Sequence, residues 1–363
     1  MREGWEYKKL GDFISEYSVK NRCNETIPVY SVTNSQGFCK DYFSKEVASQ
    51  DKRTYKIVPY GCFAYNPSRI NVGSVDWQNK EDRVIVSPLY NVFSVSENLN
   101  QDFLLYFLKS NGTMGIINTL ATGTVRLNLK LSMLKEFPII VPPLSVQQSI
   151  VEELNAINEL IRLKKEQLKD YDNLAQSIFY EMFGDPVVNE KGWEVDYLSH
   201  LCNVFAGGDK PSDLSEMQSK DFPYPVIANG DGDKGILGYS KMCKIKEDAV
   251  TIGARGASIG NCRLVRNGFT PAIRLITLVP QMKLDCNYLY YYVRNMNYRV
   301  NGVAQAQLTV PNVQRELIPI PPLPLQQLFA QRIELIEKQK AEVQRTIADL
   351  ETLLASRMQY WFD

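Results

Sequence analysis

The sequence predicts an α+β protein of two repeated domains with mixed sheets, separated by two long antiparallel coiled-coil helices with pseudo-two-fold symmetry. Three observations support this prediction. Short motifs recur in the same order in both halves of the 363-residue chain, two long segments carry a heptad pattern, and the rest consists of short β-prone runs separated by Gly, Pro and Asn. We expect domains at residues 1–141 and 185–320, and spacer helices at 142–184 and 321–363.

The internal repeat is the most informative of these observations. The offset between the two copies drifts by only a few residues along the chain, which indicates a duplication with small insertions. Because the order is domain, helix, domain, helix, the chain can close on itself as a pseudo-symmetric object. The matching motifs are Gly4-Trp5-Glu6 with Gly192-Trp193-Glu194, the aromatic stretch 102–110 with 287–295, and Pro142-Pro143-Leu144 before Gln147-Gln148 with Pro321-Pro322-Leu323 before Gln326-Gln327.

After each Pro-Pro-Leu motif, apolar residues follow each other in alternating steps of four and three, the period of a coiled-coil seam. A helix over residues 145–183 would be about 58 Å long at about 1.5 Å per residue, and its seam must be buried. The simplest partner is the other copy, packed antiparallel; ordinary packing on a globular core is the alternative. The seam residues are Ile150, Leu154, Ile157, Ile161 and Leu168, then Ile333, Ile336, Val343, Ile347 and Leu350, with polar interruptions at Lys164, Lys340 and Arg357.

The stretches before the two long segments have a different pattern. Short runs rich in Val, Ile and Tyr, at residues 54–58, 84–86 and 249–252, are bounded by turn residues and predict strands. Residues 102–110 and 286–297 predict helices with aromatic inner faces. Each copy is therefore expected to be a mixed α+β domain.

The charge of the whole chain is balanced, with 41 basic and 41 acidic residues, which argues against attachment to nucleic acid by bulk charge. The local distribution is uneven. Residues 234–315 hold 12 basic and three acidic residues, whereas residues 209–233 hold two and six. The basic tract is a candidate phosphate-facing surface, and neutralisation by the nearby acidic residues is the alternative.

Several kinds of catalytic centre are not indicated. His200 is the only histidine, and the seven cysteines form no C-x-x-C pair, so we expect no triad, no metal site and reduced thiols in a cytoplasmic protein. The chain lacks a signal-like apolar start and any apolar stretch of membrane-spanning length. The segment 66–69 reads Asn-Pro-Ser-Arg, without the Asn-Pro-Pro-aromatic tetrad of an adenine methyltransferase. We therefore expect no catalytic residues.

Two Gly-rich segments lie in the second domain. The segment 229–235 lacks the twelfth-position Glu of a calcium loop, and the segment 252–260 lacks the Lys-Ser/Thr ending of a P-loop. We interpret the second as a loop that lets the backbone approach a ligand closely and presents Arg255, although simple turn glycines at Gly256 and Gly260 are an equal alternative. The first copy carries the segment 65–73 at the equivalent place, where Arg69 matches Arg255 in residue type.

Taken together, these features closely resemble the specificity (S) subunits of type I restriction–modification enzymes. The resemblance is carried by the repeat order, the two Gly-Trp-Glu starts and the Gly-Ala-Arg-Gly-Ala-Ser-Ile-Gly loop at 253–260. It is also carried by Ile-Ile-Val-Pro-Pro-Leu-Ser-Val-Gln-Gln at 139–148 and Ile-Pro-Ile-Pro-Pro-Leu-Pro-Leu-Gln-Gln at 318–327. It covers essentially the whole chain.

The resemblance implies a non-catalytic subunit. Each domain would be a target recognition domain that reads one half of a bipartite double-stranded DNA site. The spacer helices, with the seam residues named above, would set the half-site spacing and dock two methyltransferase (M) subunits. Those subunits would bind S-adenosylmethionine and methylate a flipped adenine. Restriction (R) subunits would use ATP and Mg for translocation and cleavage. This chain would bind none of these cofactors itself.

Candidate DNA-binding residues follow from their chemistry and from the repeat, since Arg and Asn suit paired hydrogen bonds with guanine and adenine edges. Arg126 and Asn128 are matched to Gln307 and Thr309. A coiled-coil scaffold without sequence-specific DNA binding is the alternative function, and a fused methyltransferase or nuclease is a third. The candidates are Lys52, Arg53, Asn66, Arg69, Arg126, Asn128, Asn229, Lys234, Arg255, Ser258 and Gln307.

Overall fold

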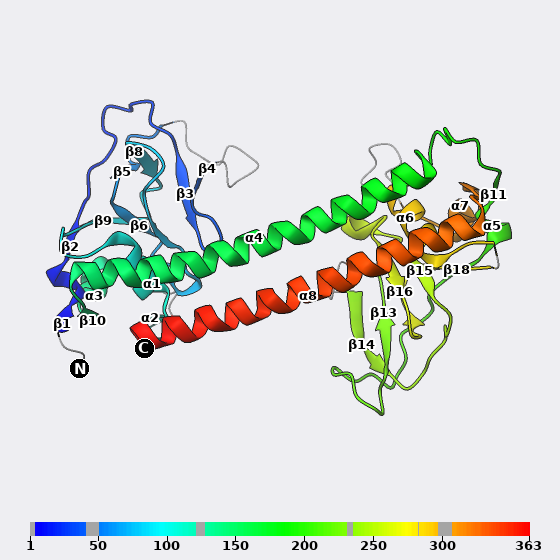
Figure 1. Cartoon of the computed structure of the whole chain (residues 1–363). Coiled ribbons are helices and arrows are strands. Elements are labelled where there is room, and N and C mark those ends of the chain that lie inside the picture. The colour runs from blue at the N-terminus through cyan, green and yellow to red at the C-terminus, as the bar shows by residue number, and fades with distance from the viewer. Residues whose placement is uncertain (1–3, 41–50, 121–127, 231–234, 282, 297–306) are drawn as a thin grey trace. The chain divides into compact units, whose positions relative to one another are not determined.

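The computed structural model describes residues 4–40, 51–120, 128–230, 235–281, 283–296 and 307–363. It divides into two compact units, one formed by Met1–Lys164 with Thr346–Asp363 and the other by Lys165–Arg345. We call them unit 1 and unit 2. Each contains one domain together with a part of each long helix (Figure 1).

Unit 1 is built around a four-stranded antiparallel sheet in the order β2-β9-β6-β7. The core joins this sheet to the first helix, because Phe63, Phe93 and Phe103 belong to one buried cluster. The sheet strands are β2 (Ile14–Glu16), β9 (Asn91–Val95), β6 (Phe63–Tyr65) and β7 (Val75–Trp77). Further antiparallel pairs are β1 (Glu6–Lys9) with β10 (Pro138–Val141), β3 (Tyr30–Thr33) with β4 (Gly37–Lys40), and β5 (Lys56–Pro59) with β8 (Arg83–Val86). The helices are α1 (Gln101–Lys109), α2 (Asn111–Leu120) and α3 (Leu131–Lys135), with 3₁₀ turns η1 (Leu10–Asp12) and η2 (Ile70–Val72).

Unit 2 repeats this plan with the sheet order β12-β18-β15-β16. A three-stranded sheet, β14-β13-β17, lies beside it and is mixed, since β13 and β17 run parallel. The strands are β11 (Val195–Tyr197), β12 (Cys202–Ala206), β13 (Tyr224–Ile227), β14 (Ile236–Ser240), β15 (Ala249–Gly253), β16 (Cys262–Val265), β17 (Thr270–Pro271), β18 (Leu275–Pro280) and β19 (Leu317–Pro319). The helices are α5 (Leu198–Leu201), α6 (Cys286–Asn295) and α7 (Val310–Gln314), with a 3₁₀ turn η4 (Gly256–Ser258).

The two units confirm the repeat and the predicted α+β class. Strands β2, β9, β6 and β7 correspond in order to β12, β18, β15 and β16, and the pair β1–β10 corresponds to β11–β19. The predicted strands at 54–58, 84–86 and 249–252 appear as β5, β8 and β15, and the predicted helices at 102–110 and 286–297 appear as α1 and α6.

The two long segments form single helices, α4 (Leu144–Phe183) and α8 (Leu323–Phe362), drawn in green and in orange to red in Figure 1. In unit 1, Arg357 Nη2 donates to Glu153 Oε2 at 2.9 Å. In unit 2, Lys340 Nζ donates to Asp172 Oδ1 at 2.9 Å. Since the earlier residue of α4 pairs with the later residue of α8, the helices pack antiparallel. None of the helices in the described part of the chain is long and apolar enough to cross a membrane.

The heptad seam is buried, but not only against the other helix. Ile150 and Leu154 belong to the core of unit 1, and Ile333 and Ile336 belong to the core of unit 2. The seam therefore packs partly as a coiled coil against the other long helix and partly as an ordinary amphipathic face against a domain core. The buried seam residues are Ile150, Leu154, Ile157, Ile161, Ile333, Ile336, Val343 and Ile347, while Leu168 and Leu350 are half-buried.

This burial places the seam side chains inside the two units, where they join the long helices to the domain cores. Their part in docking another subunit stays a prediction. Two of the predicted polar interruptions, Lys340 and Arg357, are used for the cross-helix ion pairs. The exposed leucines of the two long helices are Leu144, Leu160, Leu163, Leu174, Leu323, Leu328, Leu335 and Leu353.

The first glutamine of each Gln-Gln motif fixes the start of a long helix. Gln147 is fully buried, and its Oε1 accepts from the backbone N–H of Asn100 at 2.8 Å while its Nε2 donates to the carbonyl of Pro142 at 2.8 Å. Gln326 makes the same two bonds, to Asp285 and Pro321. Because Asn100 and Asp285 are the N-caps of α1 and α6, each glutamine ties a long helix to its domain.

Candidate nucleic-acid interface

The loop between β15 and β16 is a tight, closed turn. The backbone N–H of Gly253 donates to the carbonyl of Asn261 at 2.9 Å, and that of Gly260 donates to the carbonyl of Gly253 at 3.0 Å. A Cβ on Gly253 would lie 2.1 Å from the carbonyl oxygen of Ser258, so no side chain fits there. Gly256 and Gly260 have φ of +65° and +78°, which makes them turn glycines, as the alternative interpretation expected.

Three predicted residues from separate segments meet at this loop. Arg255 Nη2 donates to Gln307 Oε1 at 2.5 Å, and Asn229 Nδ2 donates to the carbonyl of Arg255 at 2.8 Å. The backbone N–H of Leu308 donates to the carbonyl of Ala254 at 3.0 Å, which fastens the segment before α7 to the loop. We call Asn229, Arg255 and Gln307 the Arg255 cluster.

Two polar atoms of the Arg255 cluster are buried without a hydrogen-bond partner. They are Asn229 Oδ1 and Arg255 Nε, among only five such side-chain atoms in the part of the chain that the structure describes. Buried polar atoms without partners are uncommon, and they mark places where a ligand or water completes the bonding. Ser258 lies in the same loop and is half-buried, while Lys234 lies outside the described residues.

Unit 1 has a loop of the same construction between β6 and β7. The backbone N–H of Asn66 donates to the carbonyl of Ser74 at 3.3 Å, and that of Leu129, before α3, donates to the carbonyl of Pro67 at 3.2 Å. Asn66 Oδ1 accepts from the N–H of Ser68 at 3.0 Å, so its oxygen stabilises its own turn. Arg69 is exposed at the start of η2, and its guanidinium forms no hydrogen bond or ion pair with the described residues.

These matching bonds fix the equivalence of the two loops, in the same register in which segments 65–73 and 252–260 match in the sequence. Leu129 corresponds to Leu308 and Pro67 to Ala254. The residue equivalent to Arg255 is therefore Ser68, one position before Arg69. Arg69 therefore matches Arg255 in residue type and not in position.

The same register places Asn128, not Arg126, opposite Gln307. Arg126 lies outside the described residues. Thr309, which was matched to Asn128, is the N-cap of α7 and accepts from the N–H of Asn312. Asn128 and Gln307 are both exposed, so their side chains are accessible beside the loops.

Two further candidates lie before β5. The backbone N–H of Lys52 donates to Asn24 Oδ1 at 3.0 Å, and Arg53 pairs with Asp51 at 3.4 Å. In the described structure, no hydrogen bond or ion pair joins either side chain to the β6–β7 loop. Lys52 and Arg53 therefore do not belong to the same constellation as Arg69.

Two residues that support the unit 1 loop were missed from the sequence. Asn34 follows β3, and its Oδ1 lies 2.3 Å from where a Cβ on Gly73 would be. Asp76 accepts from the N–H of Phe38 and of Trp77, each at 2.9 Å, and so holds the β3–β4 hairpin against β7; burial raises the pKa of its carboxyl. The turn-like sequence after β3 could have indicated a structural role for Asn34. No sequence feature around Asp76 indicated its role.

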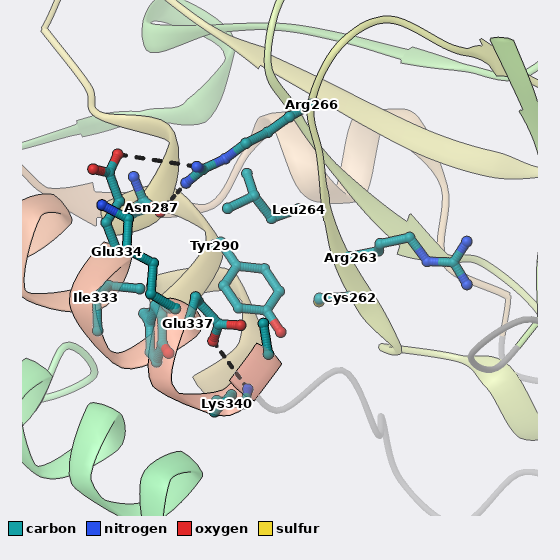
Figure 2. A pocket seen from close by; sticks show the side chains of 13 residues that line it. Cys262, Arg263, Leu264, Arg266, Asn287, Tyr290, Ile333, Glu334, Glu337 and Lys340 are labelled. Carbon is teal, nitrogen blue, oxygen red and sulfur yellow. Dashed lines mark hydrogen bonds and ion pairs between the residues drawn. The ribbon is translucent and has the colours of Figure 1, made fainter. Parts of the chain in front are cut away.

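One arginine of the basic tract has acidic partners within unit 2: Arg266 lies 3.8 Å from Asp248 and 4.0 Å from Glu334, neither of which belongs to the acidic segment 209–233. Figure 2 shows Arg266 directed toward Asn287, to which it donates at 2.7 Å, and toward Glu334, at 4.0 Å. Arg266, Asn287 and Glu334 line a cavity of about 660 Å³ between β16, α6 and α8. In the same cavity, Glu337 pairs with Lys340 at 2.9 Å. No group of three potential metal ligands occurs in the described residues.

Comparison with known proteins decides the family. The model of the type I restriction modification DNA specificity domain matches residues 2–170 and again residues 190–352. The chain belongs to this family. Its members are the DNA specificity subunits of type I restriction–modification systems, which are not catalytic, and the two matches give this specificity subunit two target-recognition domains.

Relatives and solved structures agree with this assignment. A Mycoplasma pneumoniae protein named as a type I specificity subunit is 26% identical over 337 residues, which cover 89% of this chain and 85% of the relative. A chain from a structure concerned with complex assembly and conformational transition of the type I R-M system has a TM-score of 0.61 at 20% identity, over 99% of this chain and 98% of that one. The S subunit from M. genitalium has a TM-score of 0.59 at 15% identity, covering 99% and 96%. These two likenesses confirm the fold of the specificity subunit.

Proposed function

We propose that this chain assembles into a type I restriction–modification complex in which each recognition domain reads one half of a bipartite DNA site. The observation that carries the proposal is the duplicated loop construction. In each unit a loop between two sheet strands is fastened to the segment before a short helix by the same backbone bond, Leu129 to Pro67 and Leu308 to Ala254. Two loops of the same construction in one chain can each contact one of two half-sites.

The side chains at these two places have the chemistry that DNA recognition needs. Arg69, Asn128 and Gln307 are exposed, and Arg255 is half-buried beside Gln307. Arginine donates two parallel hydrogen bonds to guanine, while asparagine and glutamine both donate to and accept from adenine. Contacts to phosphate oxygens add affinity without sequence information.

The long helices provide the spacing and the partner surface. We propose that α4 and α8 hold the recognition domains a fixed distance apart and dock two methyltransferase subunits through exposed leucines. Leu335 of α8 is 63% exposed and Leu160 of α4 is 47% exposed, so each long helix offers apolar side chains that a partner subunit could cover. S-adenosylmethionine, ATP and Mg would be bound by the methyltransferase and restriction subunits.

The experiment that tests this function is methylation mapping. The chain is co-expressed with the methyltransferase subunit of its own system, and methylated adenines in a random DNA library are located by single-molecule sequencing. A split motif that disappears when this chain is omitted supports the proposal. Methylation at a contiguous motif, or the same motif without this chain, contradicts it.

A further inference from the structure

The two recognition loops each carry an arginine, but the structure supports these arginines very differently. The Arg255 guanidinium is fixed by Gln307 at 2.5 Å, its backbone carbonyl is held by Asn229 at 2.8 Å, and its Nε is buried. Arg69 is exposed, and its guanidinium makes no hydrogen bond or ion pair among the described residues. One arginine is pre-positioned and the other is free to move.

The bonding capacity left on Arg255 suits a specific acceptor. Nη2 carries two N–H groups and gives one to Gln307, which leaves one on Nη2 and two on Nη1. A guanine presents two acceptors, O6 and N7, side by side in the major groove. The planar end of the guanidinium can donate to both at once, and the bond to Gln307 does not compete with them.

We propose that Arg255 reads a guanine in the half-site of the second recognition domain, that Gln307 is its positioning residue, and that Arg69 contacts phosphate. This inference rests on the proposed function. The residues equivalent to Arg255 and Gln307 in unit 1 are Ser68 and Asn128, which cannot form a guanidinium–carboxamide pair. This pre-positioned arginine contact therefore has no counterpart at the equivalent place in unit 1.

The difference in pre-positioning is the physical reason for assigning a base contact to Arg255 and a phosphate contact to Arg69. A base edge must be met with the correct angle and distance, so a base-reading arginine benefits from a neighbour that restricts its rotamers before DNA binds. A phosphate offers acceptor oxygens in several directions and moves with the backbone, so a mobile side chain can follow it. The buried Nε further limits the directions in which Arg255 can turn.

The test uses methylation motifs of the assembled complex with Arg69 as the matched control. Arg255→Ala and Arg255→Lys should both lower the preference for guanine at one position of the second half-site by on the order of tenfold to a hundredfold. Lysine fails here because it cannot donate bidentately. The first half-site should be unchanged. Arg69→Ala should lower methylation of all sequences by the same factor, and Arg69→Lys should restore it.

Gln307 is tested through the same readout. Gln307→Ala should weaken the guanine preference at that one position, and Gln307→Glu, which keeps an acceptor oxygen, should restore it. A purely structural role would lower methylation at every sequence and leave the motif unchanged. Asn128→Ala is the control in the other domain and should not alter the second half-site.

The inference is overturned if Arg255→Ala lowers methylation equally at all sequences with the motif intact, or if Arg255→Lys preserves the guanine preference. Either result would make Arg255 a phosphate contact. Failure of the proposed function gives a different result, because the wild-type complex would then show no split motif at all. Copurification with the methyltransferase subunit verifies that each variant is folded.

Discussion

Replacing Gln147 by methionine should destabilise unit 1 strongly, because its carboxamide satisfies buried backbone groups from two segments. Its Oε1 accepts from Asn100 at 2.8 Å, and its Nε2 donates to Pro142 at 2.8 Å and to Asn98 at 3.1 Å. The side chain is completely buried. Methionine fills a similar volume but leaves these three groups without partners.

The expected loss follows from the cost of buried groups without hydrogen bonds. Each such backbone group costs about 1–3 kcal/mol, and partial relaxation or water entry reduces the sum. We expect the free energy of unfolding of unit 1 to fall by about 2–4 kcal/mol. Gln148→Met is the matched control. That neighbouring side chain is exposed, donates to Glu152 at 3.1 Å and accepts from the side chain of Asn100 at 3.3 Å; because both bonds are open to water, its replacement should change stability by less than about 0.5 kcal/mol.

Urea unfolding followed by tryptophan fluorescence measures the effect and locates it. Trp5, Trp77 and Trp361 lie in unit 1, and Trp193 lies in unit 2. Gln326→Met should produce the same loss in unit 2, since Gln326 makes the same bonds. If Gln147→Met loses less than about 1 kcal/mol, or no more than Gln148→Met, the proposed role of the glutamine is wrong.

Three further predictions concern the loop, the helix pair and the spacing. Gly253→Ala should abolish reading of the second half-site in methylation maps, because its Cβ would lie 2.1 Å from the Ser258 carbonyl; an unchanged motif would exclude this close approach. The hydrogen bond from Arg357 lowers the pKa of Glu153, so the pair contributes stability above the ordinary glutamate pKa and loses it as pH falls through the lowered one. Glu153→Gln should therefore lower the urea midpoint at pH 7, and its difference from wild type should shrink as the pH falls below the ordinary glutamate pKa and through the lowered one; a difference that stays constant with pH would contradict this. Inserting one heptad into both α4 and α8 adds about 10.5 Å of helix and should lengthen the spacer between half-sites by about three base pairs, whereas an unchanged spacer would refute the ruler role.

The long helices and the repeat could be predicted because their signals are local. Each helix follows a double proline, carries a 3.5-residue apolar period and has no internal Gly or Pro beyond its first turn. The polar interruptions at Lys340 and Arg357 were visible too, although their partners Asp172 and Glu153 were not. Partners across an antiparallel pair depend on the stagger of the two helices, which periodicity does not determine.

The recognition loops show where prediction from sequence stops. The candidates Asn229, Arg255 and Gln307 could be chosen from residue type, and segments 65–73 and 252–260 could be matched, but the equivalence of Asn128 and Gln307 could not be predicted. It is set by backbone hydrogen bonds between residues about 50–60 positions apart, such as Leu129 to Pro67. Asp76 was missed for the same reason, because its role exists only once the β3–β4 hairpin lies against β7.

The central claim is that each domain reads its own half-site independently. The most direct measurement is the methylation motif of a complex whose first recognition domain has been replaced by a second copy of residues 185–320. Because the copies are attached to antiparallel helices, the account predicts an inverted repeat of the second half-site with the first half-site lost. Retention of the original first half-site by the assembled complex would contradict it.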